Sequence, residues 1–275
     1  MSAAPVLQYP GGKARQAARI VGLLPPGRTL IEPFMGAGSV TLAAASAHAG
    51  RIEASDVDAD LVHFHAAVRE APDKVHAEAT ALDAEPTDDY YLAVREAFNA
   101  GAAPATSAPC PWRAGVLLWL NRAGYNGLYR RNRKGGYNVP FGKRAVTIPP
   151  AERLRAASRA LRGVSLRAQD FEAALATAGD GDVVYLDPPY LPLKPGGFTA
   201  YSGTPFGEAD HKRLHAAAHA ARRRGADVLM SNHIVPATFA CYPTFELALT
   251  IEEKRTINRN GDDREPVLEA VLRAR

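Results

Sequence analysis

The sequence predicts an α/β fold built on a mostly parallel sheet, and three observations lead to that prediction. Short apolar runs alternate along the chain with longer segments of helical spacing, as in folds whose helices connect parallel strands. One apolar run, RTLIEPF, leads directly into the glycine turn MGAGS. Another, DVVYL, ends on an acid and is followed by two prolines, which cannot extend a sheet.

Each element has its own local signal. The expected strands are 28–34, 51–56, 183–186 and 227–232; the first and third are buried apolar runs, and the second ends on an acid. The expected helices, which have apolar residues at helical spacing, are 40–49, 59–70, 87–99, 113–123 and 208–226. Thr87 is placed to cap the third of these helices. Residues 267–274 fit a strand or a helix, and the Ala/Pro/Ser-rich stretch 100–112 is typical of an irregular connection.

Length and composition limit the classes of protein to consider. A chain of 275 residues allows one large domain, or a core with a small second domain. It has no apolar run long enough for a membrane span and no visible signal peptide. The two cysteines, Cys110 and Cys241, lie far apart without metal-ligand spacing, so we expect a reducing cytoplasm and no metal. A net charge of +4 permits an acidic partner without requiring one.

The stretch DVVYLDPPYLP places an acid and a tyrosine at the end of a buried strand. Residues 183–186 are continuously apolar, and Pro188 and Pro189 force the chain out of the sheet directly after Asp187. Asp187 is therefore expected at the carboxyl edge of the sheet, with Tyr190 just beyond it. Open α/β sheets bind ligands at this edge. The alternative is an ordinary exit from a strand into a loop.

The glycine turn and the next strand predict a nucleotide-like cofactor. Gly36 and Gly38 allow a tight turn and a close approach of ligand to backbone. Asp56 ends the next strand, at a spacing that suits an acid bound to ribose hydroxyls. The same arrangement serves NAD and S-adenosylmethionine. The third glycine of a dinucleotide motif is missing, since Thr41 stands in its place, and this weakens the NAD alternative.

The segment 119–144, WLNRAGYNGLYRRNRKGGYNVPFGKR, predicts a nucleic-acid partner. It interleaves cations, aromatic residues and asparagines and contains no acid. Cations suit phosphates, aromatic rings suit stacking or wedging, and Arg and Asn suit base edges. Residues 134–136, Lys-Gly-Gly, are typical of a hairpin tip. The alternative is a solvated basic loop, although such loops more often include acids.

Taken together and in this order, these motifs resemble the Dam-type DNA adenine methyltransferases of the Asp-Pro-Pro-Tyr class. The resemblance covers nearly the whole chain. It rests on the segments YPGGKARQ, FMGAGSV, ASDVDADL, NRAGYNGLYRRNRKGGYNVPFG, DPPY, FTAYS and MSNH.

The resemblance implies a Rossmann-like methyltransferase sheet with an inserted helical and β-hairpin target-recognition domain. The catalytic domain would comprise residues 1–58 and 146–275, and the DNA-binding domain residues 59–145. The implied donor is S-adenosylmethionine, and the implied target is the adenine of GATC in double-stranded DNA. We expect a cytoplasmic, nucleoid-associated protein without metal or membrane. The sequence leaves open whether a partner restriction endonuclease exists.

The chemistry implied by the resemblance gives a role to each part of Asp-Pro-Pro-Tyr. Asp187 and the Pro188 carbonyl would accept the two hydrogens of the adenine amine and orient its nitrogen toward the methyl group. Pro189 would help to hold that carbonyl rigid, and Tyr190 would stack on the base. The base must leave the duplex, at a cost of a few kcal/mol. Tyr125 and Asn126 would fill the gap.

The resemblance also carries the remaining site residues. The implied cofactor contacts are Tyr9, Lys13, Phe34, Gly36, Gly38, Asp56, Asp170, Phe171 and Asp187. The implied DNA contacts are Arg122, Tyr125, Asn126, Leu128, Arg130, Asn132, Pro140, Lys143 and Arg144.

Two departures from the family pattern affect the target sequence. Gln8 stands where well-studied members carry a base-contacting lysine, and Arg144 stands where they carry an aromatic residue. Leu128 and Arg130 match the pattern for the later bases. The second half of a GATC site is therefore better supported than the first, and the outer bases can differ.

Three alternatives remain at this point. Asp-Pro-Pro-Tyr also suits methylation of the cytosine amine, although the recognition segment favours adenine. An NAD-dependent oxidoreductase is weakened by the missing glycine. A catalytically silent DNA-binding protein would be expected to lose Asp187 or the glycines, and all are intact.

Overall fold

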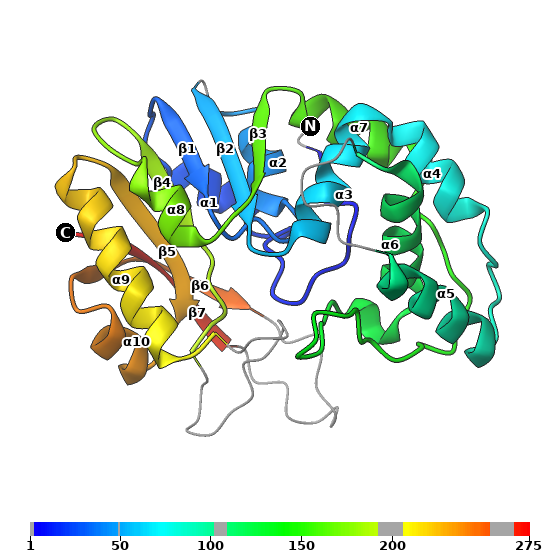
Figure 1. Ribbon diagram of the computed structural model, residues 1–275. Helices are drawn as coiled ribbons and strands as arrows, with labels where there is room; N and C mark the ends of the chain where they lie inside the picture. The colour runs from blue at the N-terminus through cyan, green and yellow to red at the C-terminus, as the bar shows by residue number, and fades with distance from the viewer. Residues whose placement is uncertain (1–2, 49, 102–108, 192–205, 254–266) are drawn as a thin grey trace.

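The computed structural model describes residues 3–48, 50–101, 109–191, 206–253 and 267–275. Within them, seven strands form one sheet in the order β3-β2-β1-β4-β5-β7-β6 (Figure 1). Strands β1 to β5 are parallel, and β7 is antiparallel to both of its neighbours. The strands are β1 Thr29–Glu32, β2 Arg51–Asp56, β3 Val164–Ala168, β4 Val183–Leu186, β5 Asp227–His233, β6 Phe245–Glu253 and β7 Val267–Ala274. This mixed sheet confirms the Rossmann-like α/β prediction.

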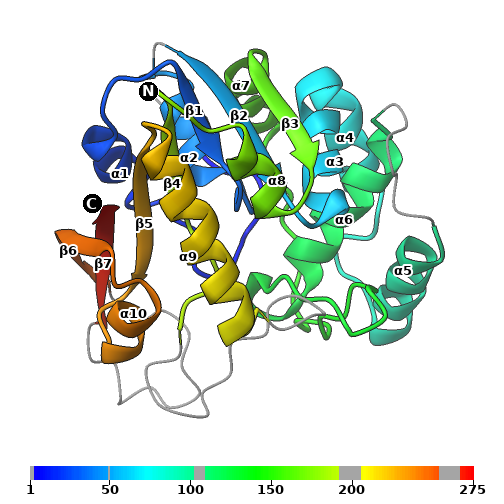
Figure 2. The same ribbon diagram turned by 60° about the vertical axis from the view of Figure 1, so that its left-hand side comes forward.

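Helices cover both faces of the sheet. Helices α8 and α9 lie on one face, and α1 and α2 lie behind the other, as the views in Figures 1 and 2 show. The helices around the sheet are α1 Ala17–Leu23, α2 Ser39–Ala44, α3 Ala59–Glu70, α7 Ala151–Leu161, α8 Phe171–Ala176, α9 Glu208–Arg223 and α10 Pro236–Cys241.

The central strands are buried on both faces, which explains why they read as continuous apolar runs. All four residues of β1 and of β4 are buried. Neighbouring residues of one strand belong to different hydrophobic clusters, because side chains alternate across a strand. Leu30 packs with Ile20 of α1, whereas Ile31 packs in the cluster that includes Leu214 of α9. The carboxyl ends of β1, β2 and β4 therefore meet at one edge of a rigid platform.

A group of helices stands beside the sheet at its β3 end, on the right of Figure 1. Helix α6 is its buried centre and packs against α3, α4 and α5. Helix α3 also contacts β2 and β3, so it joins this group to the sheet. After α6 the chain continues through a short 3-10 turn into a loop that returns beside it. The bounds are α4 Pro72–Thr80, α5 Asp88–Ala100, α6 Pro111–Ala123 and η1 Tyr125–Gly127.

Helical spacing and capping residues in the sequence predicted several elements correctly. The helix expected at 59–70 has those bounds, and Thr87 caps α5 by accepting a hydrogen bond from the Tyr90 N–H at 3.2 Å. Residues 267–274 form a strand, since they pair with β5 and β6 on either side. The irregular connection is shorter than expected, because α5 reaches Ala100 and α6 begins at Pro111, where a proline suits the first helical position. Residues 102–108 lie outside the described residues.

Other predictions were wrong in extent or missing. The helix expected at 40–49 ends at Ala44, and the strand expected at 28–34 covers only Thr29–Glu32. Strand β3 was missed because its second half is exposed and polar. Strand β6 was also missed, although its sequence FELALTIEE alternates apolar and polar residues as an edge strand does. Five further helices were not predicted from the sequence: α1, α4, α7, α8 and α10.

Candidate active site

Three carboxyl groups lie at the carboxyl ends of three adjacent parallel strands. Glu32 ends β1, Asp56 ends β2, and Asp187 directly follows β4. Burial raises the pKa of Glu32 to about 8 and that of Asp56 to about 6. Burial also raises the pKa of Asp187, and the charge of Lys13 opposes that rise. A cationic ligand at this edge would stabilise the ionised forms of Asp56 and Asp187, and a phosphate would destabilise them.

A cationic partner of Asp187 comes from the N-terminal segment. Lys13 Nζ lies 3.0 Å from Asp187 Oδ1, and only 5% of the Lys13 side chain is exposed. The same ammonium donates to the Gly11 carbonyl at 2.6 Å and lies 4.8 Å from the centre of the Tyr190 ring. Lys13 and Tyr190, both expected at the site, therefore meet at Asp187. A structural role as an exposed helix-start lysine does not fit this burial.

The Asp-Pro-Pro-Tyr segment is fastened to the neighbouring strands. The Tyr190 hydroxyl donates to Glu269 Oε2 of β7 at 3.2 Å, and its ring meets the His233 ring edge-on at 4.8 Å. The Leu191 N–H donates to Asn232 Oδ1 of β5 at 3.3 Å. Asn232 and His233 belong to the MSNH motif, which thus acts as a support for the loop. Because Pro188 and Pro189 stand between Asp187, which pairs with Lys13, and the anchored Tyr190, the loop backbone is held firmly.

The glycine turn is joined to the second acid by a direct hydrogen bond. Gly36 and Gly38 have φ of +48° and +74°, which side chains other than glycine adopt at a cost. The Gly36 N–H donates to Asp56 Oδ2 at 3.0 Å. A Cβ added at Gly36 would lie 3.1 Å from the Tyr9 ring, so this turn admits no side chain. Tyr9, Gly36 and Asp56 therefore form one wall of the site.

Two aromatic residues expected at the cofactor site pack against one another. The rings of Phe34 and Phe171 stack with their centres 5.6 Å apart, and Phe206 joins them. Phe171 is buried in the core that lies under α9. Asp170 caps α8 by accepting from the Glu172 N–H and pairs with Arg213 on the surface. Phe34 is thus the more accessible member of the pair, and Asp170 has a structural role whatever it binds.

Sequence reasoning missed four residues of this site. Glu32 follows the first strand directly, and Thr41, which we had noted only as a missing glycine, donates from Oγ1 to Glu32 Oε2. His65 Nε2 lies 2.9 Å from the Gly36 carbonyl oxygen, and burial lowers the pKa of His65 to about 4. Val57 is 71% exposed although it is apolar and follows Asp56 directly. Its position after a strand-ending acid was the available signal.

The recognition segment begins with an exposed turn. Tyr125 and Asn126 are both exposed in η1, and Asn126 has φ of +52°. The turn is held from below, since the Tyr125 N–H donates to the Pro140 carbonyl at 2.9 Å. Gly127 lies against Gln8, where an added Cβ would lie 2.0 Å from the glutamine side-chain oxygen. Two side chains expected to enter DNA are therefore presented on a supported tip.

Gln8 is fixed through its backbone, and its side chain lies against Gly127. The buried Asn121 side chain accepts from the Gln8 N–H and donates to the Gln8 carbonyl, both at 2.8 Å. The Gln8 residue is exposed. The N-terminal segment is thereby placed beside the tip that carries Tyr125 and Asn126.

The cationic side chains predicted to contact DNA differ in how strongly they are already engaged by other parts of the protein. Arg122 is partly buried, donates to the Val6 carbonyl at 2.5 Å, and has its pKa lowered by burial to about 10. Arg130 donates Nε and Nη2 to the Asn138 carbonyl at 2.9 and 2.6 Å. Lys143 and Arg144 are exposed, and Lys143 Nζ lies 3.5 Å from Asp88 Oδ2. The last two are the best placed for phosphates.

The other predicted contacts in this segment shape its loop. Asn132 Oδ1 accepts from the Lys134 and Gly136 N–H groups at 2.9 and 3.0 Å, and this forms the tight turn expected at residues 134–136. Arg131 and Tyr137 make an isolated bridge across that turn, not a regular hairpin. Leu128 packs partly against the main core, and Pro140 is exposed. We call residues 128–138 the recognition loop.

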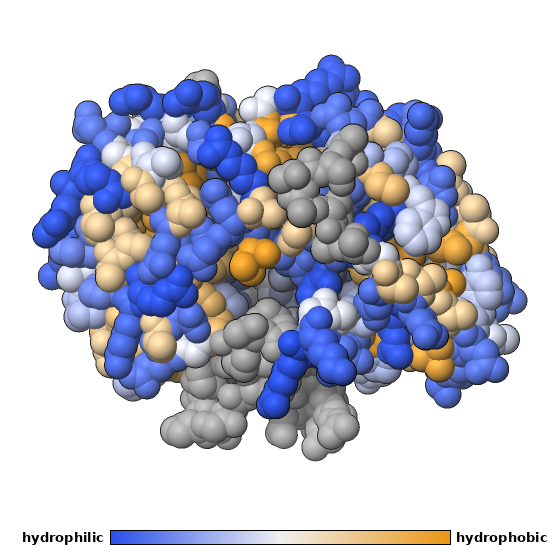
Figure 3. Space-filling model, in the orientation of Figure 1, coloured by the Kyte–Doolittle hydropathy of each residue, from blue (hydrophilic) through white to orange (hydrophobic). Residues whose placement is uncertain are grey.

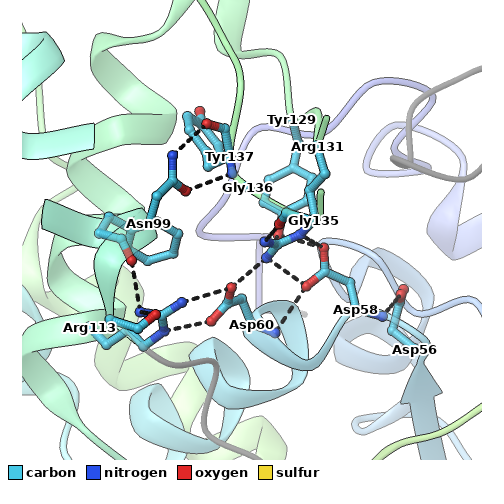
Figure 4. A network of polar contacts seen from close by, with 12 residues as sticks. Asp56, Asp58, Asp60, Asn99, Arg113, Tyr129, Arg131, Gly135, Gly136 and Tyr137 are labelled. Carbon is cyan, nitrogen blue, oxygen red and sulfur yellow. Dashed lines mark hydrogen bonds and ion pairs between the residues drawn. The ribbon is translucent and has the colours of Figure 1, made fainter. Parts of the chain in front are cut away.

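One cation of the basic segment is turned inward. Arg131 bonds to Asp58 and Asp60 at the start of α3, as Figure 4 shows. Burial raises the pKa of Asp60, but hydrogen bonds from Arg113 and the charge of Arg131 outweigh it and hold that pKa below its usual value. Arg131, which is not among the predicted DNA contacts, is therefore engaged inside the protein.

Other features of the surface set limits on the site. On the face shown in Figure 3, apolar side chains form small separate patches among hydrophilic ones. No helix in the described part of the chain is long and apolar enough to cross a bilayer. Among the same residues, no group of three or more His, Cys, Asp or Glu side chains could hold a metal ion. The FTAYS motif, at 198–202, lies outside the described residues.

Comparison with known proteins decides the family. The model of the D12 class of N6 adenine-specific DNA methyltransferases matches residues 9–257. The chain belongs to this family. The match contains the glycine turn, Asp56, the recognition loop and Asp187.

Relatives of the same class match along most of the chain. A DNA adenine methylase of Serratia marcescens is 36% identical over 259 residues, which are 92% of each chain. The DNA adenine methylase of Escherichia coli K12 is 34% identical over 95% of this chain and 91% of its own. A DNA N-6-adenine-methyltransferase of Escherichia phage P1 is 35% identical over 94% of this chain but only 34% of its own.

Solved structures show more distant likenesses. TrmN from Thermus thermophilus has a TM-score of 0.38 and 14% identity, over 95% of this chain and 48% of its own. A precorrin-6y C5,15-methyltransferase from Geobacter metallireducens has a TM-score of 0.36 and 11% identity, over 96% and 89%. These likenesses add nothing to what the strand order shows.

Proposed function

We propose that this D12-class enzyme transfers a methyl group from S-adenosylmethionine to the exocyclic amine of adenine in double-stranded DNA, in the cytoplasm. The observation that carries the proposal is the convergence of Glu32, Asp56 and Asp187 on one edge of the sheet. A sulfonium with a nearby ammonium would favour the ionised forms of Asp56 and Asp187, whereas Glu32, with a pKa of about 8, is largely protonated at neutral pH and adds little charge. The family match favours adenine over the cytosine amine.

The residues at this edge fit the donor. Asp56 would accept from the ribose hydroxyls, and exposed Val57 beside it offers an apolar surface to the adenine ring. The turn of Gly36 and Gly38, which has no space for a side chain at Gly36, would lie against the methionine part together with Phe34. Bound there, S-adenosylmethionine supplies an electrophilic methyl group on a positively charged sulfur.

Asp187 and the rigid loop after it would prepare the amine. The lone pair of the adenine amine is delocalised into the ring, so the nitrogen needs hydrogen bonds that localise it. The Asp187 carboxylate and the Pro188 carbonyl would accept its two hydrogens. Lys13 opposes the effect of burial on Asp187 and fixes the orientation of its carboxylate at 3.0 Å. Tyr190 would support the base by stacking.

The adenine must leave the duplex to reach Asp187. Extrusion of a base costs a few kcal/mol, which a side chain inserted in its place can offset. Tyr125 and Asn126 suit this role because they are exposed on a supported turn. We propose a division of labour in which residues 1–58 and 146–275 catalyse and residues 59–145 bind DNA, with α3 joining the two through its contacts with β2, β3 and α6.

The target is proposed to be GATC or a site that differs from it in the outer bases. Methylation of a randomised DNA library by the pure protein, read by modification-sensitive sequencing, is expected to show N6-methyladenine in one short motif. Arg130→Ala is expected to relax one position of that motif by about 1–3 kcal/mol, because a bidentate Arg–guanine contact discriminates by that amount. N4-methylcytosine, or no methylation at all, would contradict the proposed function.

The same library tests the exposed Arg144 as a contrast. A phosphate contact predicts that Arg144→Ala weakens binding evenly across sequences and makes the salt dependence shallower by about one counterion. A base contact predicts a changed motif at an unchanged salt slope. If neither Arg130→Ala nor Arg144→Ala alters motif or slope, the segment is not the reading element.

Donor affinity is expected to fall in acid because of Asp56. Its pKa in the free protein is raised to about 6, and the ribose hydroxyls need the ionised form. The affinity is therefore fully present above that pKa and is lost as the pH falls through it, by about tenfold between pH 7 and pH 5. Binding calorimetry across this range measures it. Asp56→Asn should give a flat profile, and an unchanged slope in that variant would assign the titration to another group.

A further inference from the structure

Arg131 is the centre of a buried ion-pair cluster at the junction of sheet and recognition loop. Its Nη2 lies 2.8 Å from Asp58 Oδ1 and 2.5 Å from Asp60 Oδ2, and its Nε bonds Asp58 Oδ2 (Figure 4). Arg113 bonds the same Asp60 carboxylate from α6, at 2.6 and 3.0 Å. Only 16% of Arg131, 14% of Asp58 and 1% of Asp60 is exposed. We call these four residues the Arg131 cluster.

Every nitrogen of the Arg131 guanidinium has a protein partner. Besides the carboxylates, Nη1 donates to the Gly135 carbonyl at 2.6 Å and Nη2 donates to the Tyr129 hydroxyl at 2.9 Å. Gly135 forms the tip of the recognition loop, and Tyr129 stands at its base. A buried guanidinium with a partner at every nitrogen is held rigidly. Arg131 therefore fixes the tip and the base of the recognition loop to the start of α3.

A single backbone hydrogen bond links the Arg131 cluster to Asp56, the acid proposed to bind the donor. The Asp58 N–H donates to Asp56 Oδ1 at 2.9 Å, while the other oxygen of Asp56 accepts from Gly36. Both carboxylate oxygens therefore have backbone partners in the free protein. Each carboxylate oxygen can accept a second hydrogen bond, so ribose hydroxyls bonded to Asp56 would share that carboxylate with the backbone of Asp58. A change at Asp58 acts on Arg131 directly, through the ion pair.

We propose that Arg131 is a positioning residue that couples donor binding at Asp56 to DNA reading by the recognition loop. The proposal rests on the proposed function, since it requires the donor at Asp56. This coupling gives a physical reason why one cation of the segment proposed to bind DNA makes contacts inside the protein instead. The coupling is reciprocal, so the donor tightens specific DNA binding by the factor by which that DNA tightens the donor.

The test is a double variant that removes the ion pair without leaving a buried charge alone. In Asp58→Asn with Arg131→Met, the amide oxygen can still cap α3, the amide NH₂ can donate to the Tyr129 hydroxyl, and Asp60 keeps Arg113. Removing both charges of a buried pair costs far less stability than removing one. Fluorescence anisotropy with the duplex found by methylation mapping, with and without S-adenosylhomocysteine, gives the coupling factor. We expect about fivefold or more in the wild type and less than about twofold in the double variant.

Two single variants separate coupling from charge and from folding. Arg133→Ala removes an exposed cation from the same loop and should lower DNA affinity while leaving the coupling factor unchanged. Arg131→Lys keeps one charge at the cluster but not the forked geometry, so it should give an intermediate factor even if the double variant is unstable. Thermal unfolding of each variant reports its stability separately.

The outcomes are distinguishable. A double variant or an Arg131→Lys variant with the full wild-type factor overturns the proposal, as does a wild type in which S-adenosylhomocysteine binds but leaves the DNA affinity unchanged. In both cases the proposed function stands. If S-adenosylhomocysteine does not bind the wild type at all, the proposed function fails and this inference fails with it.

Discussion

Replacing Asp187 by alanine is expected to lower the single-turnover rate of methyl transfer by about 100-fold or more, while DNA binding changes little. Preorganised groups that act on the reacting atom each supply about 10²–10³ in rate. The affinity for DNA comes mostly from phosphate contacts, which Asp187 does not make. A rapid-quench assay with labelled S-adenosylmethionine and anisotropy on the same duplex measure the two quantities separately.

The matched variants locate the effect. Asp187→Asn keeps an acceptor oxygen but loses the charge that pairs with Lys13 at 3.0 Å, so its rate should fall between those of the wild type and the alanine variant. Asp73→Ala removes an exposed carboxylate on α4, far from the edge, and should leave the rate unchanged. A wild-type rate in Asp187→Ala would remove Asp187 from the mechanism.

Asp56→Ala is expected to weaken S-adenosylmethionine binding by about 100-fold or more. Each hydrogen bond to a charged group contributes about 1.5–3 kcal/mol, and the two ribose hydroxyls would both bond to this carboxylate. The substitution also removes the acceptor of the Gly36 N–H, which lies 3.0 Å from Asp56 Oδ2, so the glycine turn loses its support. Isothermal titration calorimetry gives the dissociation constants.

Two further variants separate these contributions. Asp56→Asn keeps an oxygen for a backbone N–H and should lose less affinity than Asp56→Ala. Glu53→Ala removes a carboxylate three residues earlier on the same strand, away from the carboxyl edge, and should bind as the wild type does. Equal affinities in the wild type and in Asp56→Ala would rule out the ribose assignment and, with it, the coupling proposed for Arg131.

The sequence by itself determined the fold class and two of the three carboxyl-edge acids. Asp56 could be placed because it ends an expected strand and Asp187 because it directly follows one, and a residue's position along a strand is a local property. Gly36 and Gly38 were equally local, since positive φ is a requirement of the backbone turn itself. Strand β7 could not be told from a helix, because its state depends on β5 and β6, which pair with it from distant parts of the chain.

Only the tertiary structure decided which charged side chains serve the site and which hold the protein together. Lys13 meets Asp187, and Arg131 turns inward to Asp58 and Asp60, while Arg144 of the same basic segment stays exposed. A buried charge must find a partner, because the cost of removing it from water exceeds what local contacts return. Which partner lies within reach depends on strand order and on how α3 packs against α6. That information is spread over the whole chain, so no single motif contains it.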